Sequence, residues 1–192
     1  MRLKSLGLFA FGVLALVFLM SAVSAVTIFT DNFNVVGLTG WTATGWTNTA
    51  GTYADSTNTA STIINRTIST SGYQTIIVKY DRQLATDWET TDSFKISWST
   101  NGTTFVTLEE VVGSAADTLP SDSAFVSKTF NLPTSADSNT NFQIKFECNT
   151  NAADEFCRVD NVVIEATALP VIPSEITACN AVGNPGNLDV RK

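Results

Sequence analysis

The chain lacks histidine and is poor in basic residues, and both shortages restrict what it can do. None of its 192 residues is histidine, which excludes Ser-His-Asp and Cys-His catalysis and any zinc site that uses imidazole. Eleven lysines and arginines stand against 18 aspartates and glutamates, for a formal net charge of −7. Nucleic acid and anionic membrane surfaces bind clustered Lys and Arg, so we expect neither as a main partner.

An apolar run at the N-terminus is too short to span a membrane. Basic residues in MRLK precede an apolar run over 6–20, and the small residues of SAVSA follow it. A membrane-spanning helix needs roughly 20 apolar residues, whereas Val23 and Ala25 suit signal-peptide cleavage after Ala25. We therefore expect residues 1–25 to be a signal peptide and the protein to be secreted or held at the cell surface. Membrane attachment would need an uncleaved anchor or sequence beyond Lys192.

Cysteine is scarce, with three residues at Cys148, Cys157 and Cys179. An exported chain meets oxidising conditions, in which cysteines are expected to pair. Cys148 closes one strand-like segment and Cys157 opens the next, with eight residues between them, so we predict a hairpin disulfide between these two. Closing this loop would stabilise the fold by roughly 2.5–3 kcal/mol. Cys179 then has no partner in this chain.

No window after residue 25 has an apolar stripe at helical spacing, and the pattern there predicts an all-β domain. Thr, Ser, Val, Ile and Phe recur at period two, with Gly, Asn and Asp between the runs. The predicted strands cover residues 26–30, 61–68, 74–81, 93–100, 103–111, 124–132, 141–148 and 157–166. Eight strands within about 140 residues favour two packed antiparallel sheets over one open sheet. Alternation assigns to the core Ile76, Val78, Tyr80, Phe94, Ile96, Trp98, Phe142, Ile144, Phe146 and Cys148.

One turn and two glycosylation patterns are readable in the sequence. Asn101 and Gly102 provide the two positive-φ residues that a type I′ hairpin turn requires. Asn101 followed by Gly and Thr103 is also a glycosylation acceptor pattern, as is Asn65 followed by Arg and Thr67. Both asparagines are therefore candidate sites of N-glycosylation.

The composition changes near residue 168 to ALPVIPSEITACNAVGNPGNLDVRK, which contains three prolines and two glycines. We accordingly expect one domain over residues 26–167. Residues 168–192 would then be a linker and the start of a further, truncated domain, with a disordered tail as the alternative.

An aspartate stands within the last predicted strand. Asp160 keeps step with Val162 and Ile164, which read as buried positions. An unpaired buried charge is too costly to keep, so its carboxylate should serve as a cap, a metal ligand or a catalytic group.

Three segments resemble a known group of modules: FTDNFNVVGLTGWTATGW, SFKISWSTNGTTF and RVDNVVIEA, in this order. They are similar to the jelly-roll modules of secreted and cell-surface proteins, which include MAM-like, choice-of-anchor adhesin and galactose-binding-like carbohydrate-binding domains. The similarity spans about residues 27–166 and implies a jelly-roll β-sandwich.

The resemblance also implies a structural calcium ion. In such modules, carboxylates from the N-terminal segment and from the last strand often hold calcium, and Asp31 and Asp160 match these positions best. Asn34 departs from the pattern, which more often has glutamate, so one charged ligand is missing. Two alternatives to calcium stay open for Asp160: hydrogen bonds that tie the strand ends together, or a misread register.

Three classes of function compete, and an enzyme fits least. Without histidine, a pair of carboxylates of the glycosidase type is the remaining chemistry. The adjacent pairs on offer are Glu109 with Glu110 and Asp154 with Glu155. Neighbours on a strand point to opposite faces, and loop pairs are usually solvated, so we expect no catalytic site.

The remaining two classes are a sugar-binding module and an adhesion or structural module. A sugar would stack on an exposed aromatic ring, for which Trp88 is the best candidate because no strand pattern assigns it to the core, and Trp46 is next. The Thr, Ser and Asn surface and the apparent linker instead favour a non-catalytic adhesion or structural module of a larger cell-surface protein. Its partner would be a glycan or another surface protein, and a carbohydrate-binding module is the alternative.

Overall fold

The computed structural model describes residues 24–56, 61–85, 88–114, 122, 124–152 and 154–171. Most of the predicted leader and tail, including Cys179, lies outside these residues. The strands are β1 (Ala25–Asp31), β2 (Thr42–Thr44), β3 (Ala54–Ser56), β4 (Thr62–Ile68), β5 (Tyr73–Leu84), β6 (Ser93–Ser99), β7 (Val106–Val112), β8 (Val126–Asn131), β9 (Phe142–Asn149) and β10 (Cys157–Ala168), with one 3-10 turn, η1 (Thr134–Ala136). In this part of the chain, no helix has the length and apolarity needed to cross a membrane.

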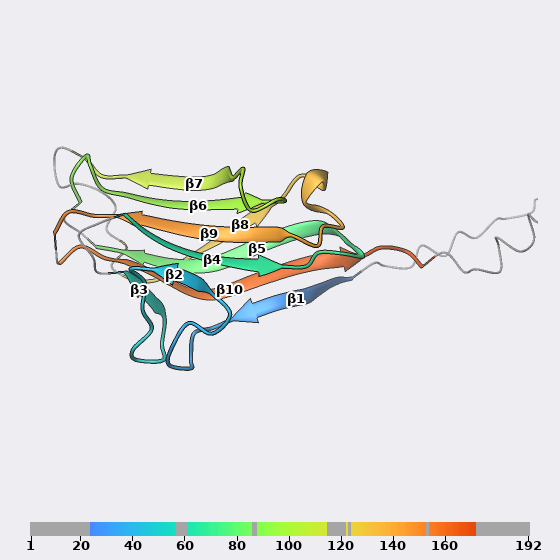
Figure 1. Cartoon of the computed structure of the whole chain (residues 1–192), viewed down its shortest axis with the longest axis horizontal. Helices are drawn as coiled ribbons and strands as arrows, with labels where there is room; N and C mark the ends of the chain where they lie inside the picture. Colours follow the sequence, from blue (N-terminus) through green and yellow to red (C-terminus); the bar gives the residue numbers. More distant parts are fainter. Residues whose placement is uncertain are drawn as a thin grey trace, which may run out of the picture.

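The strands form two antiparallel sheets packed face to face, as the sequence predicts (Figure 1). In the first sheet the order is β1-β10-β5-β8, and β3 also pairs with β10. In the second sheet the order is β2-β4-β9-β6-β7. All eight predicted strands are present. The two short strands β2 and β3, of three residues each, were missed because so few residues carry no readable alternation.

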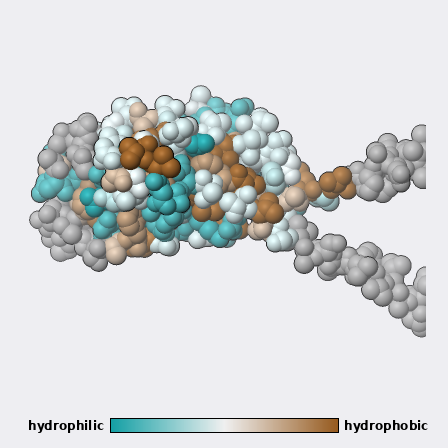
Figure 2. Space-filling model, turned by 90° about the horizontal axis from the view of Figure 1, so that it is seen from below, coloured by the Kyte–Doolittle hydropathy of each residue, from teal (hydrophilic) through white to brown (hydrophobic). Residues whose placement is uncertain are grey.

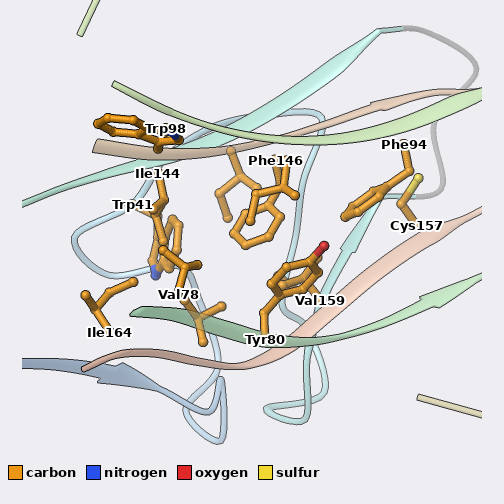
Figure 3. Close-up of a cluster of buried hydrophobic side chains, with 14 of the residues drawn as sticks. Trp41, Val78, Tyr80, Phe94, Trp98, Ile144, Phe146, Cys157, Val159 and Ile164 are labelled. Atoms are coloured by element: carbon orange, nitrogen blue, oxygen red, sulfur yellow. The ribbon is translucent and has the colours of Figure 1, made fainter. Parts of the chain in front are cut away.

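The core lies between the sheets, where aromatic rings from both sheets meet (Figure 3). Tyr80 of β5 contacts Phe146 of β9 with ring centroids 5.3 Å apart, and Phe146 in turn lies 6.2 Å from Phe94 of β6. All ten residues that the alternation assigned to the core are buried. The core prediction is therefore confirmed.

A β-bulge in β10 corrects the interpretation of Asp160. The alternation places Asp160 on the inward face with Val162. However, Asn161 has a φ of 47°, and the register with β5 shifts between Asp160 and Val163. This irregularity lets Val159 and Val162 both point into the core. Asp160 consequently lies half-buried on the outer face of the first sheet, so the register was misread.

The β6–β7 connection is a hairpin, but its turn is not the predicted type. A type I′ turn needs positive φ at both central residues; Gly102 has a φ of 71°, whereas Asn101 stays outside the left-handed region. The loop spans residues 100–105, between Ser99 and Val106. Asn101 shapes it by accepting hydrogen bonds from the backbone N–H groups of Thr103 and Thr104, each 2.9 Å long.

Cys148 and Cys157 form the predicted disulfide, with their Cα atoms 6.0 Å apart. The bond joins β9 of the second sheet to β10 of the first. It is therefore a staple between the two sheets and not a link between neighbouring strands of one hairpin.

The two ends of the domain leave from one end of the sandwich. Ala25 of β1 pairs with Thr167 of β10, so the first and last strands begin and end side by side (Figure 1). Cys157, where β10 begins, marks the opposite end. We call this opposite end the distal end.

Candidate functional site

Both tryptophans that were expected to present a face to a sugar are buried. The exposed fraction is 0% for Trp88 and 4% for Trp46, so the expectation that these rings are exposed is wrong. Trp88 belongs to the core although it precedes a polar turn. The backbone at Gly113 packs against the residue that follows Trp88: a Cβ atom on Gly113 would lie 1.7 Å from the carbonyl oxygen of Glu89. No strand pattern marks Trp88, because the chain delivers this ring to the core from a loop.

Exposed aromatic and polar groups gather instead on the outer face of the first sheet, toward the distal end. Asp55 of β3 and Gln83 of β5 both pair with Arg158 of β10, so these three residues form one row across the sheet. The neighbouring Val159 points into the core, so alternation directs the side chains of this row outward. The next row contains Asp160, Asp81 and Ser127, from β10, β5 and β8. We call the following set the polar-aromatic face: Tyr53, Asp55, Asp81, Gln83, Phe125, Ser127, Arg158, Asp160 and Asn161.

Arg158 organises the first row. Its Nε donates to Oδ1 of Asp55 at 3.0 Å, and Nη1 donates to Oε1 of Gln83 at 3.4 Å. The guanidinium carbon lies 4.9 Å from the ring centroid of Tyr53 and 3.9 Å from that of Phe156. Cation–π contacts and an ion pair hold the guanidinium in place between two aromatic rings.

Tyr53 and Phe125 reach toward each other from opposite sides of this row. Tyr53 precedes β3 and Phe125 precedes β8, which lie on different sides of the β10–β5 pair. Their ring centroids are nevertheless 5.7 Å apart. Phe125 is 36% exposed and Tyr53 is half-buried. The two rings, tilted at 51° to each other, therefore place aromatic surface next to the polar groups of this face.

The second row is a hydrogen-bonded group of carboxylates and neutral donors. Asn161 Nδ2 donates to Oδ2 of Asp81 at 2.8 Å and to Oδ2 of Asp160 at 3.3 Å, while the Ser127 hydroxyl donates to Oδ1 of Asp81. Burial, followed by the carboxylates of Asp81 and Asp31, raises the pKa of Asp160, and the hydrogen bond from the Asn161 N–H opposes this rise. The bulge at Asn161 places this amide over both carboxylates.

Asp31 lies next to this row but is engaged by its own segment. Its Oδ1 accepts from the Phe33 N–H at 2.9 Å, and its Oδ2 accepts from Trp41 Nε1 at 2.8 Å. Both oxygens thus tie the end of β1 to the segment that follows it. From the sequence, hydrogen bonds at the strand ends are an alternative to a calcium site at Asp160. Hydrogen bonds of this kind are present, but Asp31 accepts them and not Asp160.

A second group of carboxylates lies at the distal end, where the sequence did not predict one. The oxygens of Glu89, Asp92 and Glu155 lie within 4.8 Å of one another; we call these residues the acidic cluster. Asp92 and Glu155 are 0% and 1% exposed, respectively. A cluster of this kind could hold a metal ion.

Two loops build the acidic cluster. In the turn before β6, the Glu89 N–H donates to Oδ2 of Asp92 at 2.6 Å. In the loop between β9 and β10, which the disulfide closes, Glu155 Oε2 accepts from the N–H groups of Asn151 and Ala152 at 2.8 and 2.7 Å. Asn151 Nδ2 donates to Oε2 of Glu89 at 3.0 Å and to Oδ1 of Asp92 at 3.3 Å, so it joins the two loops.

Burial and neighbouring charge make the acidic cluster costly when it is fully ionised. Burial first, and then the Glu89 and Glu155 carboxylates, raise the pKa of Asp92 to about 6, against a hydrogen bond from the Glu89 N–H that lowers it. The pKa of Glu89 is lowered, chiefly by its interaction with Asp92 and by the Asn151 amide. Such opposed shifts are typical of carboxylates that share a proton.

No protein-family model matches this sequence, and a search of curated proteins finds no relative. Among solved structures, the K3 adhesin domain of Lys-gingipain from Porphyromonas gingivalis is similar with a TM-score of 0.53 at 15% identity, covering 74% of this chain and 99% of that domain. The CBM22-1 xylan-binding domain from Paenibacillus barcinonensis Xyn10C has a TM-score of 0.50 at 10% identity, covering 78% of this chain and all of that domain. These similarities show a shared architecture. The chain has the jelly-roll β-sandwich fold, as the sequence resemblance implies.

Proposed function

We propose that this protein is an exported, non-catalytic adhesion module that recognises a neutral glycan through the polar-aromatic face. The observation that carries the proposal is the contact between the Tyr53 and Phe125 rings beside fixed carboxylate, amide and guanidinium groups. A sugar ring has an apolar face and a rim of hydroxyls, so it suits a site that pairs aromatic surface with a few oriented polar groups.

The charge of the face favours a neutral glycan over an anionic one. The face contains three aspartates, Asp55, Asp81 and Asp160, and one arginine, Arg158, which is already ion-paired with Asp55. A uronic or sialic acid would bring its carboxylate close to Asp81 and Asp160, and like charges at this range repel. Neutral hydroxyls can instead donate to these same carboxylates.

The structural neighbours support the same class of function. One is named as an adhesin domain and another as a xylan-binding domain. Xylan is a largely neutral polysaccharide and is therefore the first ligand to test, alongside an array of neutral and acidic glycans.

A non-catalytic role is supported by the environment of the carboxylates. Glu109 and Glu110 form separate ion pairs, with Lys128 at 3.2 Å and Lys95 at 3.0 Å. In the acidic cluster, Asp92 and Glu155 are buried, so a substrate cannot reach them without rearrangement of the loops.

The proposal is tested by comparing three aromatic variants on a glycan array and by titration calorimetry. We expect Tyr53→Ala and Phe125→Ala each to weaken binding at least tenfold. Phe105→Ala is the matched control, because it removes a half-buried ring that contacts Lys145 outside the polar-aromatic face, and it should bind as the wild type does. A wild-type protein that binds no glycan, or three variants with equal affinity, would contradict the proposal.

We further propose that the acidic cluster binds a structural calcium ion. Calcium prefers carboxylate and carbonyl oxygens, and the cluster provides two buried carboxylates, the exposed Glu89 and an adjacent amide in Asn151. Rotation of that amide by half a turn would direct Oδ1 toward the ion in place of Nδ2. Asp31 with Asp160 is the alternative site, and it fits less well because it offers two carboxylates, whereas the acidic cluster brings three within 4.8 Å of one another.

Thermal unfolding with calcium or with chelator distinguishes these sites. We expect calcium to raise the melting temperature of the wild type and of Asp31→Asn, and to leave Asp92→Asn unchanged. Equal midpoints in the wild type would show that no structural ion is bound. If calcium no longer raises the melting temperature of Asp31→Asn but still raises that of Asp92→Asn, the ion binds at Asp31 and Asp160 instead.

Contact with another surface protein is a second candidate function. Val35 and Val36, in the segment after β1, are 77% and 65% exposed. On the face seen from below, however, the hydrophobic residues form separate patches between hydrophilic ones (Figure 2). Protein docking sites usually present a larger continuous apolar patch, which is why we favour glycan recognition.

A further inference from the structure

The loop between β6 and β7 holds Asn101 in a conformation suited to covalent modification. Asn101 is exposed, and its Oδ1 accepts hydrogen bonds from the Thr103 N–H at 2.9 Å, the Thr104 N–H at 2.9 Å and the Thr103 hydroxyl at 3.0 Å. These bonds all end on the amide oxygen. Among the described residues, no hydrogen bond engages the amide nitrogen Nδ2, which is the atom that receives a sugar in N-glycosylation.

Asn65, the second acceptor pattern, lies in a very different setting. It is half-buried in β4, where its backbone pairs with Thr42 of β2 on one side and Lys145 of β9 on the other. A transferase cannot draw Asn65 into its active site without separating these strands. The folded protein therefore presents one of its two acceptor patterns.

A hollow next to Asn101 offers room for the first sugar. It has a volume of about 380 Å³ and is lined by Trp98, Asn101, Val106, Pro133 and Ser135, together with Ser99, Thr100 and Thr104. Small-molecule pockets begin at about 300 Å³, so a single sugar ring fits. Val106 is 51% exposed, and together with Pro133 it gives the hollow an apolar side that a sugar would cover.

We propose that Asn101 carries an N-linked glycan in the exported protein, that its first sugar lies in this hollow, and that Asn65 is unmodified. The donor class is a lipid-phosphate-linked oligosaccharide. A bond forms between Asn101 Nδ2 and the anomeric carbon of the sugar, the bond from that carbon to the lipid phosphate oxygen breaks, and one amide proton is lost to a base. This proposal is independent of glycan recognition by the polar-aromatic face.

Glycopeptide mass spectrometry of the protein secreted by its own cells tests the attachment. Thr103→Ser and Thr103→Ala form a matched pair, because both keep Asn101 and the backbone N–H groups that it binds, whereas the alanine removes the acceptor pattern. We expect a sugar mass on Asn101 in the wild type and in Thr103→Ser, and none in Thr103→Ala. An unmodified Asn101 in the wild type, or a glycan on Asn65, would overturn the proposal.

Comparing the melting temperatures of the glycosylated and deglycosylated forms tests whether the first sugar lies in the hollow. We expect the glycan to raise the melting temperature of the wild type and to raise that of Val106→Ser by less, since serine offers the sugar less apolar contact. An equal rise in both proteins would overturn the placement of the sugar in the hollow.

Discussion

Trp88 illustrates how far a single residue can depart from its sequence context. It is fully buried although polar residues surround it in LATDWETTD. Because the ring fills the core at the distal end, we predict that Trp88→Ala lowers the free energy of unfolding by about 3–5 kcal/mol. Urea denaturation measures this, and Trp88→Phe should lose less. A loss below about 1 kcal/mol for the alanine would contradict the burial of this ring.

The raised pKa of Asp92 makes the folding stability of the protein in chelator depend on pH. Its pKa is raised from an ordinary value of 3.8 to about 6 in the folded state, so the folded protein holds the proton more tightly than the unfolded chain does. The resulting stability is fully present below about pH 4 and is lost as the pH rises through about 6. In chelator, the melting temperature of the wild type should therefore fall relative to that of Asp92→Asn between pH 4 and 7. A difference that does not change with pH would contradict this.

At the scale of elements, the disulfide connects stability with the acidic cluster. It staples β9 to β10 and closes the loop that carries Glu155. Replacing Cys148 and Cys157 together with alanine should lower the free energy of unfolding by roughly 2.5–3 kcal/mol and weaken the calcium response, because Glu155 loses its fixed position. Denaturation of the double variant with and without calcium checks both effects. Unchanged stability would show that the staple is dispensable.

The elements also show what the sequence could and could not predict. Alternation located the eight longer strands and the core, because each of these strands has one buried face. It could not reveal the bulge at Asn161, since one extra residue moves Asp160 to the opposite face without altering composition. The polar-aromatic face and the acidic cluster escaped prediction for a related reason. Tyr53, Phe125, Glu89 and Glu155 lie outside the strands, and only the sheet topology brings them together.

At the scale of the whole molecule, both candidate sites lie away from the end of the sandwich where β1 begins and β10 ends. The domain ends leave beside the Ala25–Thr167 pair, whereas the acidic cluster and the Arg158 row are at or near the distal end, where β10 begins (Figure 1). A module held to a surface by its ends would thus present the polar-aromatic face away from its attachment. This geometry agrees with adhesion through a glycan.

Mapping the bound glycan by NMR tests recognition by the polar-aromatic face most directly. Backbone amide shifts of the isotope-labelled protein would be followed while xylan fragments, or the neutral glycan that binds best on the array, are added. We predict shifts concentrated in residues 53–55, 81–83, 125–127 and 158–161. Shifts confined to the hollow around residues 98–106 and 133–135, or no shifts with any glycan tested, would contradict glycan recognition by this face.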